Sequence, residues 1–154
     1  MKLPPQYFRA GVGVIVINRE GHVLAMERVD VPGAWQLPQG GLDEDEEPKK
    51  AAFREVMEET AISEDSLELI DAYPEPLAYE LPAANRKKKT GRGQVHYWFL
   101  FQFTGDESTI DVTSGGEFST WRWMPFGALL ETVVEFRKPV YERLAEYFAT
   151  YLSR

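Results

Sequence analysis

Hydrophobic residues follow two different periods along this chain. Residues 11–17 (GVGVIVI) form a dense run of β-branched residues, which predicts a buried strand. A polar turn at 18–21 (NREG) follows, and residues 22–28 (HVLAMER) are expected to return as the partner strand of a hairpin. Three later runs, at 67–73, 94–104 and 117–123, are rich in β-branched and aromatic residues and predict further strands.

Two segments are expected to be helical. The acidic run 43–47 precedes Pro48, and both features favour the first turn of a helix, which we expect to continue to about Thr60. The chain is also expected to be helical from Arg137 onward, with Pro139 near the start. The residues expected to face the core are Ala52, Phe53, Val56 and Met57 in the first helix and Val140, Leu144, Phe148 and Tyr151 in the second.

The order of these elements indicates the fold class. Residues 31–41 (VPGAWQLPQGG) are rich in Pro and Gly and indicate an irregular loop, with a short strand near Trp35. Hairpin, helix, strands and helix together predict a mixed α/β domain of sandwich type. The chain has 154 residues, of which 44% are hydrophobic. This length and composition predict a single domain over 1–154 with a sizeable core.

Composition excludes several kinds of chemistry. The chain has no cysteine, which excludes disulfides, thiolate zinc sites and thiol catalysis. Its two histidines, His22 and His96, are too few for a zinc site built from histidines. The net charge of −8 argues against broad nucleic-acid binding through the overall field, so DNA is not an expected partner. There is no secretion signal and no run near the ~18 apolar residues of a membrane span, so we expect no membrane partner and a cytoplasmic location. The oligomeric state stays open.

Three glutamates lie close together in the first predicted helix. Glu55, Glu58 and Glu59 fall within an arc of roughly 100° around the helix axis. Like charges three or four residues apart cost about 0.2–0.5 kcal/mol per pair, so a purely structural helix would gain more from lysines at these positions. Two interpretations follow: a solvated acidic face, or a site for a hard divalent cation such as Mg²⁺, which prefers oxygen ligands.

The residues around this triplet resemble a known motif. The segment is similar to the Nudix box, Gly-x5-Glu-x7-Arg-Glu-U-x-Glu-Glu-x-Gly-U, where U is aliphatic. Eight of the nine defined positions agree, namely Gly40, Glu46, Arg54, Glu55, Val56, Glu58, Glu59 and Ile62. The exception is Ala61, where the family has a glycine that ends the helix in the left-handed conformation. Alanine in that conformation costs about 1–2 kcal/mol.

The resemblance implies a Nudix-type α/β/α sandwich with a mixed β-sheet and a hydrolase that uses Mg²⁺, with Mn²⁺ as an alternative ion. In the family the three box glutamates are catalytic and bind metal, which assigns these roles to Glu55, Glu58 and Glu59. The carbonyl of Gly40 is implied as a further ligand. Glu46 and Arg54 are implied to form a structural ion pair between loop and helix.

A fourth acidic residue comes from a later segment. Residues 117–123 (EFSTWRW) resemble the family pattern Glu-Phe-x-x-Trp, which carries a catalytic and metal-binding role onto Glu117. The alternative for Glu117 is an ordinary surface residue of an edge strand.

Four further segments resemble one subgroup, the diadenosine tetraphosphate hydrolases and RNA 5′-pyrophosphohydrolases. They are 32–41 (PGAWQLPQGG), 78–82 (AYELP), 93–103 (GQVHYWFLFQF) and 133–144 (VVEFRKPVYERL). The substrate-binding residues implied by this resemblance are Arg9, Arg28, Gln39, Tyr79, Phe136 and Arg137. Core packing is the alternative for Tyr79 and Phe136, and a solvated cation at the start of a helix is the alternative for Arg137. The basic residues within 86–92 either contact phosphate or form a solvated loop.

The resemblance therefore implies a nucleotide or the 5′ end of an RNA as the partner. It leaves two reactions open: asymmetric hydrolysis of a dinucleoside polyphosphate, and removal of pyrophosphate from 5′-triphosphorylated RNA. A non-catalytic nucleotide-binding Nudix module is an alternative, although such modules usually have a degenerate box and all box carboxylates are present here. A structural domain with a solvated acidic helix would require the match to be a coincidence.

Overall fold

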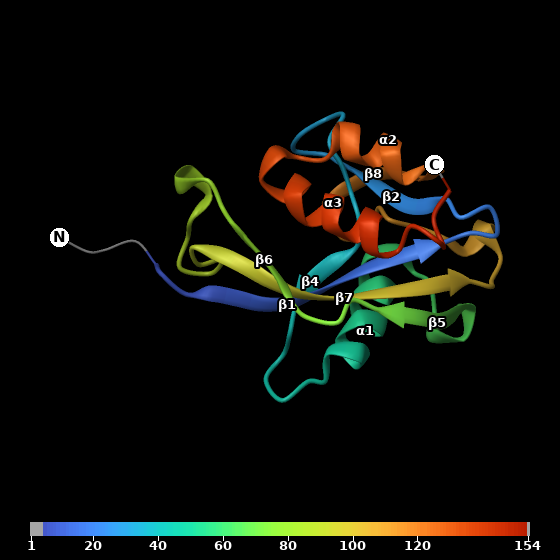
Figure 1. The fold of residues 1–154 in the computed structure, drawn as a ribbon, viewed down its shortest axis with the longest axis horizontal. Helices are drawn as coiled ribbons and strands as arrows, with labels where there is room; N and C mark the ends of the chain where they lie inside the picture. The colour runs from blue at the N-terminus through green and yellow to red at the C-terminus, as the bar shows by residue number, and fades with distance from the viewer. Residues whose placement is uncertain (1–4, 154) are drawn as a thin grey trace.

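A computed structural model describes residues 5–153 of the chain (Figure 1). The strands are β1 (Phe8–Ile17), β2 (Val23–Arg28), β3 (Trp35–Gln36), β4 (Gln39–Gly41), β5 (Leu67–Ala72), β6 (Leu77–Glu80), β7 (Gly93–Phe103) and β8 (Phe118–Met124). The α-helices are α1 (Pro48–Thr60), α2 (Phe126–Thr132) and α3 (Lys138–Tyr147). Short 3₁₀ helices lie at Glu64–Ser66, Ala83–Asn85, Glu107–Thr109 and Glu135–Arg137.

The sheet is mixed and centres on two long parallel strands. β1 and β7 pair in parallel from Phe8 opposite Gly93 to Ile17 opposite Gln102. The main strand order is β3-β2-β1-β7-β5, while β4 pairs with β1, β6 with β7 and β8 with β2. All pairs other than β1–β7 are antiparallel. The sheet brings β4, from the Gly-rich loop, next to the centre of the molecule.

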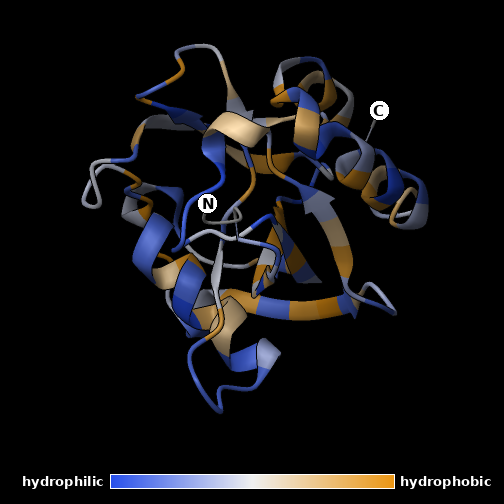
Figure 2. Ribbon diagram, turned by 90° about the vertical axis from the view of Figure 1, so that its left-hand side faces the viewer, coloured by the Kyte–Doolittle hydropathy of each residue, from blue (hydrophilic) through white to orange (hydrophobic). Residues whose placement is uncertain are grey.

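Both faces of the sheet are covered, which explains the unbroken hydrophobic run in β1. Alternate residues of a strand point to opposite faces. Val14 and Val16 therefore pack with the α1 side, and Ile15 and Ile17 pack with the side formed by α2 and α3. Figure 1 shows α1 on one side of the sheet and α2 and α3 on the other. In Figure 2, hydrophobic colouring concentrates in the strands, whereas α1 carries broad hydrophilic bands.

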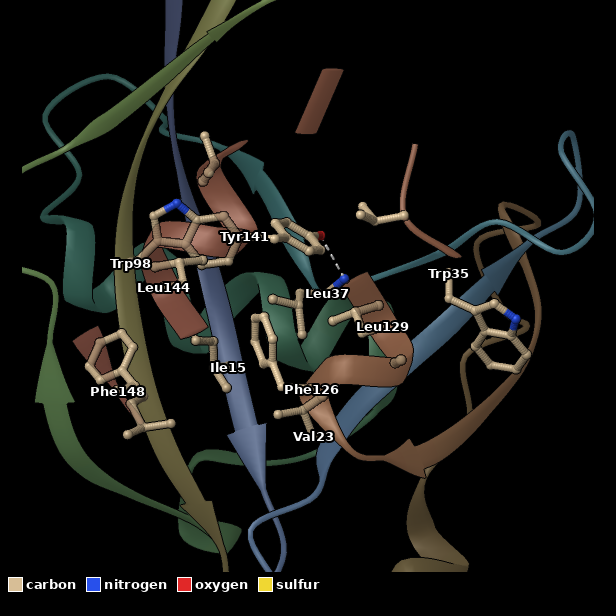
Figure 3. Packing of buried hydrophobic residues seen from close by; sticks show 14 of the residues in the cluster. Ile15, Val23, Trp35, Leu37, Trp98, Phe126, Leu129, Tyr141, Leu144 and Phe148 are labelled. Carbon is tan, nitrogen blue, oxygen red and sulfur yellow. Dashed lines mark hydrogen bonds between the residues drawn. The ribbon is translucent and has the colours of Figure 1, made fainter. Parts of the chain in front are cut away.

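The core on the α2–α3 side also fixes the loop that precedes α1. Tyr141 of α3 is almost fully buried and accepts a hydrogen bond of 3.0 Å at its hydroxyl oxygen from the backbone N–H of Leu37 (Figure 3). Its ring also packs against Trp98 of β7, with ring centroids 5.9 Å apart. This contact ties the Pro- and Gly-rich loop to the helix layer and thereby positions β4.

The structure confirms the predicted fold class, a mixed α/β sandwich, and most predicted elements. The helix predicted from Pro48 to Thr60 has these bounds. Two core assignments were wrong, because Met57 is 52% exposed and Tyr151 is 40% exposed. The sequence pattern did not predict α2, β4 or β6. Of the helices described within residues 5–153, none combines the length and apolarity needed to cross a membrane.

Candidate active site

The glutamates of α1 line a cavity of about 390 Å³. Its wall contains all four predicted acidic residues, Glu55, Glu58, Glu59 and Glu117, together with Gly40 of β4. Glu117 comes from a distant part of the chain and lies directly before β8. The structure therefore brings together in one cavity the residues that the box and the later segment suggested separately.

The helix holds its glutamates against β4. The Glu55 carboxyl lies so close to Gly40 that a Cβ atom at this glycine would come within 2.0 Å of Glu55 Cδ. Only a glycine fits this approach. Burial raises the pKa of Glu55 above its ordinary value, although hydrogen bonding to Arg54 acts in the opposite direction.

Glu59 is half-buried and has one carboxylate oxygen closed off from solvent. Its Oε1 accepts a 3.2 Å hydrogen bond from the backbone N–H of Gln39, while its buried Oε2 has no hydrogen-bond partner. Burial, followed by the nearby charge of Glu55, raises the pKa of Glu59 well above its ordinary value. A positive charge beside such a carboxyl stabilises its ionised form.

Arg54 is the cation nearest to this cluster. It forms the predicted ion pair with Glu46, through two hydrogen bonds of 2.8 Å. The same guanidinium also donates to Glu55 Oε1 at 2.8 Å and to Glu58 Oε1 at 3.2 Å. Only the pair with Glu46 was predicted, because spacing along the chain does not show that one guanidinium can reach three carboxylates.

The oxygen atoms that line the first cavity suit a divalent cation, although the carboxylates are not yet gathered around one point as metal ligands are. Within residues 5–153, no group of three or more acidic or histidine side chains is already gathered as metal ligands. Two of the carboxylates are instead held by Arg54. The available donors are carboxylate oxygens and the backbone carbonyl of Gly40, which are the ligands that Mg²⁺ and similar hard ions take. The unpartnered, buried Oε2 of Glu59 supplies one such donor.

A second cavity, of about 410 Å³, adjoins the first. The two share Gln39, Glu117 and Phe118 in their walls. The second cavity is also lined by two arginines, Arg28 and Arg137. An acidic cavity thus opens beside one with two cations.

Each of these arginines is held in place. Arg28 donates two hydrogen bonds to the carboxylate of Asp30, at 2.9 and 2.7 Å. Arg137 is only 8% exposed, and its Nη1 donates to Gln36 Oε1 at 2.5 Å. The alternative of a solvated cation for Arg137 is therefore wrong. Its Nε is buried without a partner, which leaves a donor available to a bound anion.

The other predicted substrate-binding residues divide into two groups. Arg9 and Gln39 line the first cavity. Tyr79 and Phe136 line neither cavity, and their rings pack together with centroids 5.7 Å apart. The Tyr79 hydroxyl donates to Gln94 Oε1 at 2.7 Å and accepts from Gln39 Nε2 at 3.4 Å. Tyr79 is thus placed to orient two residues of the cavity wall.

Three residues of the site were missed by the sequence reading. Gln94 and His96 of β7 line the first cavity, and Gln36 holds Arg137. Burial, with the nearby charges of Arg137 and Arg9, lowers the pKa of His96 to about 3, so that this imidazole is neutral near pH 7. The available signal was the presence of polar residues inside strongly hydrophobic strand segments, at positions where a buried polar group needs a partner.

The chain is similar to proteins of known family in both sequence and structure. A family model described as the NUDIX domain matches residues 7–144. The chain is 38% identical to an RNA pyrophosphohydrolase of Cereibacter sphaeroides, over 95% of this chain and 93% of that protein. It is also 38% identical to the chloroplastic Nudix hydrolase 26 of Arabidopsis thaliana, over 99% of this chain and 74% of that protein. Among solved structures, an Ap4A hydrolase of C. elegans in a binary complex superposes with a TM-score of 0.69 at 18% identity, covering 92% of this chain and 98% of that one.

Proposed function

The chain belongs to the Nudix family, and we propose that it is a Mg²⁺-dependent hydrolase that cleaves a phosphoanhydride bond at the 5′ end of an RNA or in a dinucleoside polyphosphate. One observation carries this proposal. The box glutamates and Glu117 line one cavity, and that cavity adjoins a second one lined by Arg28 and Arg137. A polyphosphate chain with a nucleoside attached needs both a cation-binding acidic site and positive side chains beside it.

The roles of the residues follow from their positions. Glu55, Glu58, Glu59 and the Gly40 carbonyl would hold the divalent ion, with Mn²⁺ as an alternative to Mg²⁺. When bound, such an ion neutralises phosphate charge and lowers the pKa of water. Arg9, which lines the first cavity, and Arg137, which lines the second, are the cations that we assign to the phosphate oxygens.

Glu117 stands between the two cavities. It lines both walls and is exposed, so it can accept a proton from an attacking water or complete the ligand set. Gln39 also lines both cavities, and its side-chain Oε1 is buried without a partner, which makes it available to a substrate donor group.

The two substrate classes are supported by different relatives. The Cereibacter protein is an RNA pyrophosphohydrolase with 38% identity over almost the full length of both chains. The Ap4A hydrolase of C. elegans shares the fold at 18% identity. Sequence similarity therefore favours the RNA 5′ end as the substrate. A non-catalytic module is disfavoured because every box carboxylate is present and lines the cavity.

The test is product analysis with purified protein and MgCl₂. The substrates are a short 5′-triphosphorylated RNA and diadenosine tetraphosphate, and the products are separated by anion-exchange chromatography. We expect release of pyrophosphate or phosphate from the RNA, asymmetric cleavage of the dinucleotide to AMP and ATP, and loss of both on addition of EDTA. Binding of either compound without turnover would identify a non-catalytic module, and two molecules of ADP would contradict the assignment of the reaction.

A further inference from the structure

Residues 86–92 (RKKKTGR) form a strongly basic tip between β6 and β7. This basic tip contains five cationic residues and no acidic one, in a chain whose net charge is −8. It lines neither of the two cavities. In Figure 1 the segment from β6 to the start of β7 extends away from the helices, toward the end of the molecule from which β1 starts.

Hydrogen bonds close the basic tip into a defined turn. The Lys87 carbonyl accepts from the backbone N–H groups of Thr90 and Gly91, at 3.1 and 2.7 Å, and the Lys87 N–H donates to Thr90 Oγ1 at 3.0 Å. Gly91 has φ = 73°, a conformation that glycine adopts without strain. The turn holds the three consecutive lysines on the outside of the molecule.

The cations of the basic tip divide into two kinds. Arg92 pairs with Glu80 at 2.8 Å and Arg86 lies 3.9 Å from the same residue, so both arginines anchor the tip to β6. Lys87, Lys88 and Lys89 are exposed, and in the part of the chain that the structure describes no carboxylate lies within 4.0 Å of their ammonium groups. Three positive charges are therefore available to an external anion.

Two exposed aromatic residues lie beside the basic tip. Tyr7 is 47% exposed and Phe8 is 39% exposed. The Tyr7 ring approaches Gly91 and the Phe8 ring approaches Gly93, where a Cβ atom would lie 2.9 Å and 2.5 Å from the respective ring carbons. Exposed aromatic rings next to unpaired cations are what a single-stranded nucleic acid uses, because bases stack on the rings and phosphates bind the cations.

The same strands run from the basic tip into the first cavity. Phe8 pairs with Gly93, and the next pair is Arg9 with Gln94, both of which line the cavity. The backbone from Gln94 to Gly91 spans about 10 Å at ~3.3 Å per residue. The basic tip, Tyr7 and Phe8 therefore lie within a few residues of the cavity wall along the same two strands.

We propose that the basic tip, with Tyr7 and Phe8, is a binding surface for the single-stranded RNA that follows the 5′ nucleotide held in the cavity. This inference rests on the proposed function and deepens it, because it makes the enzyme selective for an RNA chain over a free dinucleotide. A dinucleoside polyphosphate has no phosphodiester chain to reach the lysines. The field of the acidic body repels a polyanion, and the three unpaired lysines supply the local attraction that offsets this repulsion.

The first experiment measures binding without hydrolysis. A fluorescent single-stranded RNA of eight nucleotides with a 5′-hydroxyl is titrated with wild-type protein and with the triple variant K87Q/K88Q/K89Q. We expect the variant to bind about tenfold more weakly at moderate salt, and the log–log salt slope to fall by about 2, since each phosphate contact with a single strand contributes ~0.7. The variant R19Q/K49Q/K50Q loses the same charge at exposed positions outside the basic tip and should bind as the wild type does.

The second experiment measures hydrolysis of three substrates: 5′-triphosphorylated RNAs of two and eight nucleotides, and diadenosine tetraphosphate. We expect K87Q/K88Q/K89Q to raise KM about tenfold for the eight-nucleotide RNA only. Turnover of the two short substrates should be unchanged.

These two experiments separate the inference from the function on which it rests. RNA binding that depends on the lysines without hydrolysis of any substrate would support the surface and overturn the proposed function. Hydrolysis of all three substrates with no change in the K87Q/K88Q/K89Q variant would overturn the surface alone. Equal losses in the two triple variants would also overturn it, because they would show an effect of net charge only. Lysine-dependent binding to phosphatidylserine vesicles without lysine-dependent binding to RNA would overturn it in favour of an anionic lipid surface.

Discussion

The carboxylate of Glu46 and the guanidinium of Arg54 meet through two parallel hydrogen bonds of 2.8 Å, from Nε to Oε2 and from Nη2 to Oε1. Arg54 Nη2 also donates to the carbonyl of Gly41 at 2.9 Å. The pair therefore ties the loop before α1 and the end of β4 to the helix that carries the glutamates. Arg54 thus connects Glu46, in the loop, to the cavity-lining residues Glu55 and Glu58.

Replacing Glu46 tests this connection through pH. Hydrogen bonding to Arg54 lowers the pKa of Glu46 from 4.5 to about 2, so its contribution to stability is complete above pH ~4.5 and is lost as pH falls toward 2. We expect Glu46→Gln to melt a few degrees below the wild type at pH 7, with a difference that shrinks between pH 4.5 and 2. Thermal denaturation across this range measures it. Glu44→Gln, at an exposed position of the same loop, should match the wild type at every pH. A difference for Glu46→Gln that stays constant with pH would contradict the role of the ion pair.

The end of α1 offers a stabilising substitution. Ala61 adopts the left-handed conformation, with φ = 63° and ψ = 10°, and its N–H donates to the Met57 carbonyl at 3.0 Å. This conformation costs alanine about 1–2 kcal/mol, and glycine avoids that cost. Part of the gain is lost, because glycine gives the unfolded chain greater conformational freedom. We expect Ala61→Gly to increase the free energy of unfolding by about 0.5–1 kcal/mol in urea titrations. The matched change Ala145→Gly, inside α3, should instead cost about 1 kcal/mol. Equal losses in both variants would show that Ala61 is not strained.

His96 predicts a second pH effect of the same sign, over a higher range of pH. The folded protein lowers the pKa of this imidazole to about 3, below its ordinary value of 6.5. The unfolded chain therefore binds a proton that the folded protein does not, and stability is lost as pH falls from about 6.5 toward 3. For the wild type, this proton lowers the free energy of unfolding by up to about 1.4 kcal/mol for each unit that the pH falls in this range. We expect His96→Gln to lack this contribution, as measured by urea unfolding at pH 4, 5, 6 and 7. Parallel pH profiles for wild type and variant would contradict burial of a neutral imidazole.

Glu117 is expected to act on rate more than on affinity. It lies outside the box, at the boundary of both cavities. If it accepts a proton or completes the ligand set, Glu117→Ala should lower kcat by tenfold or more and change KM little. Steady-state kinetics with excess Mg²⁺ measure both constants, and Glu20→Ala, at an exposed position in the turn after β1, is the control. An unchanged kcat with a raised KM would place Glu117 in substrate recognition.

The sequence predicted the fold where local patterns are strong. Pro48 and the acidic residues before it gave the start of α1, and the β-branched run gave β1. Helix α2 has only seven residues and follows Pro125, and β6 has only four, so neither has enough turns or alternating positions to show a period. The apolar face of α1 predicts Met57 in the core, but Met57 lies about 100° around the axis from the fully buried Val56 and is 52% exposed.

The site was predicted as far as the motifs reach. The spacing of the box predicted that Glu55, Glu58 and Glu59 lie close together, and in the structure they line one cavity with Glu117. The burial of Arg137 could not be predicted, because its partner Gln36 lies 101 residues away in the chain. The position of Tyr79 outside both cavities could not be predicted either, because its neighbour Phe136 comes from a distant segment of the chain. Contacts between distant segments have no local pattern.

The central claim is that the carboxylates of α1 hold a divalent ion for phosphoanhydride hydrolysis, and Glu58→Gln tests it most directly. Glu58 is exposed and contacts Arg54 Nη1 through its two carboxylate oxygens, at 3.2 and 3.4 Å, so its loss should leave the melting temperature in metal-free buffer within a degree or two of the wild type. The control Glu47→Gln changes an exposed residue at the start of the same helix, outside both cavities. The decisive measurement is kcat as a function of Mg²⁺ concentration for the three proteins with triphosphorylated RNA. We predict that Glu58→Gln lowers kcat by at least about 100-fold at saturating Mg²⁺, while Glu47→Gln matches the wild type. Near-normal turnover of Glu58→Gln would contradict the account.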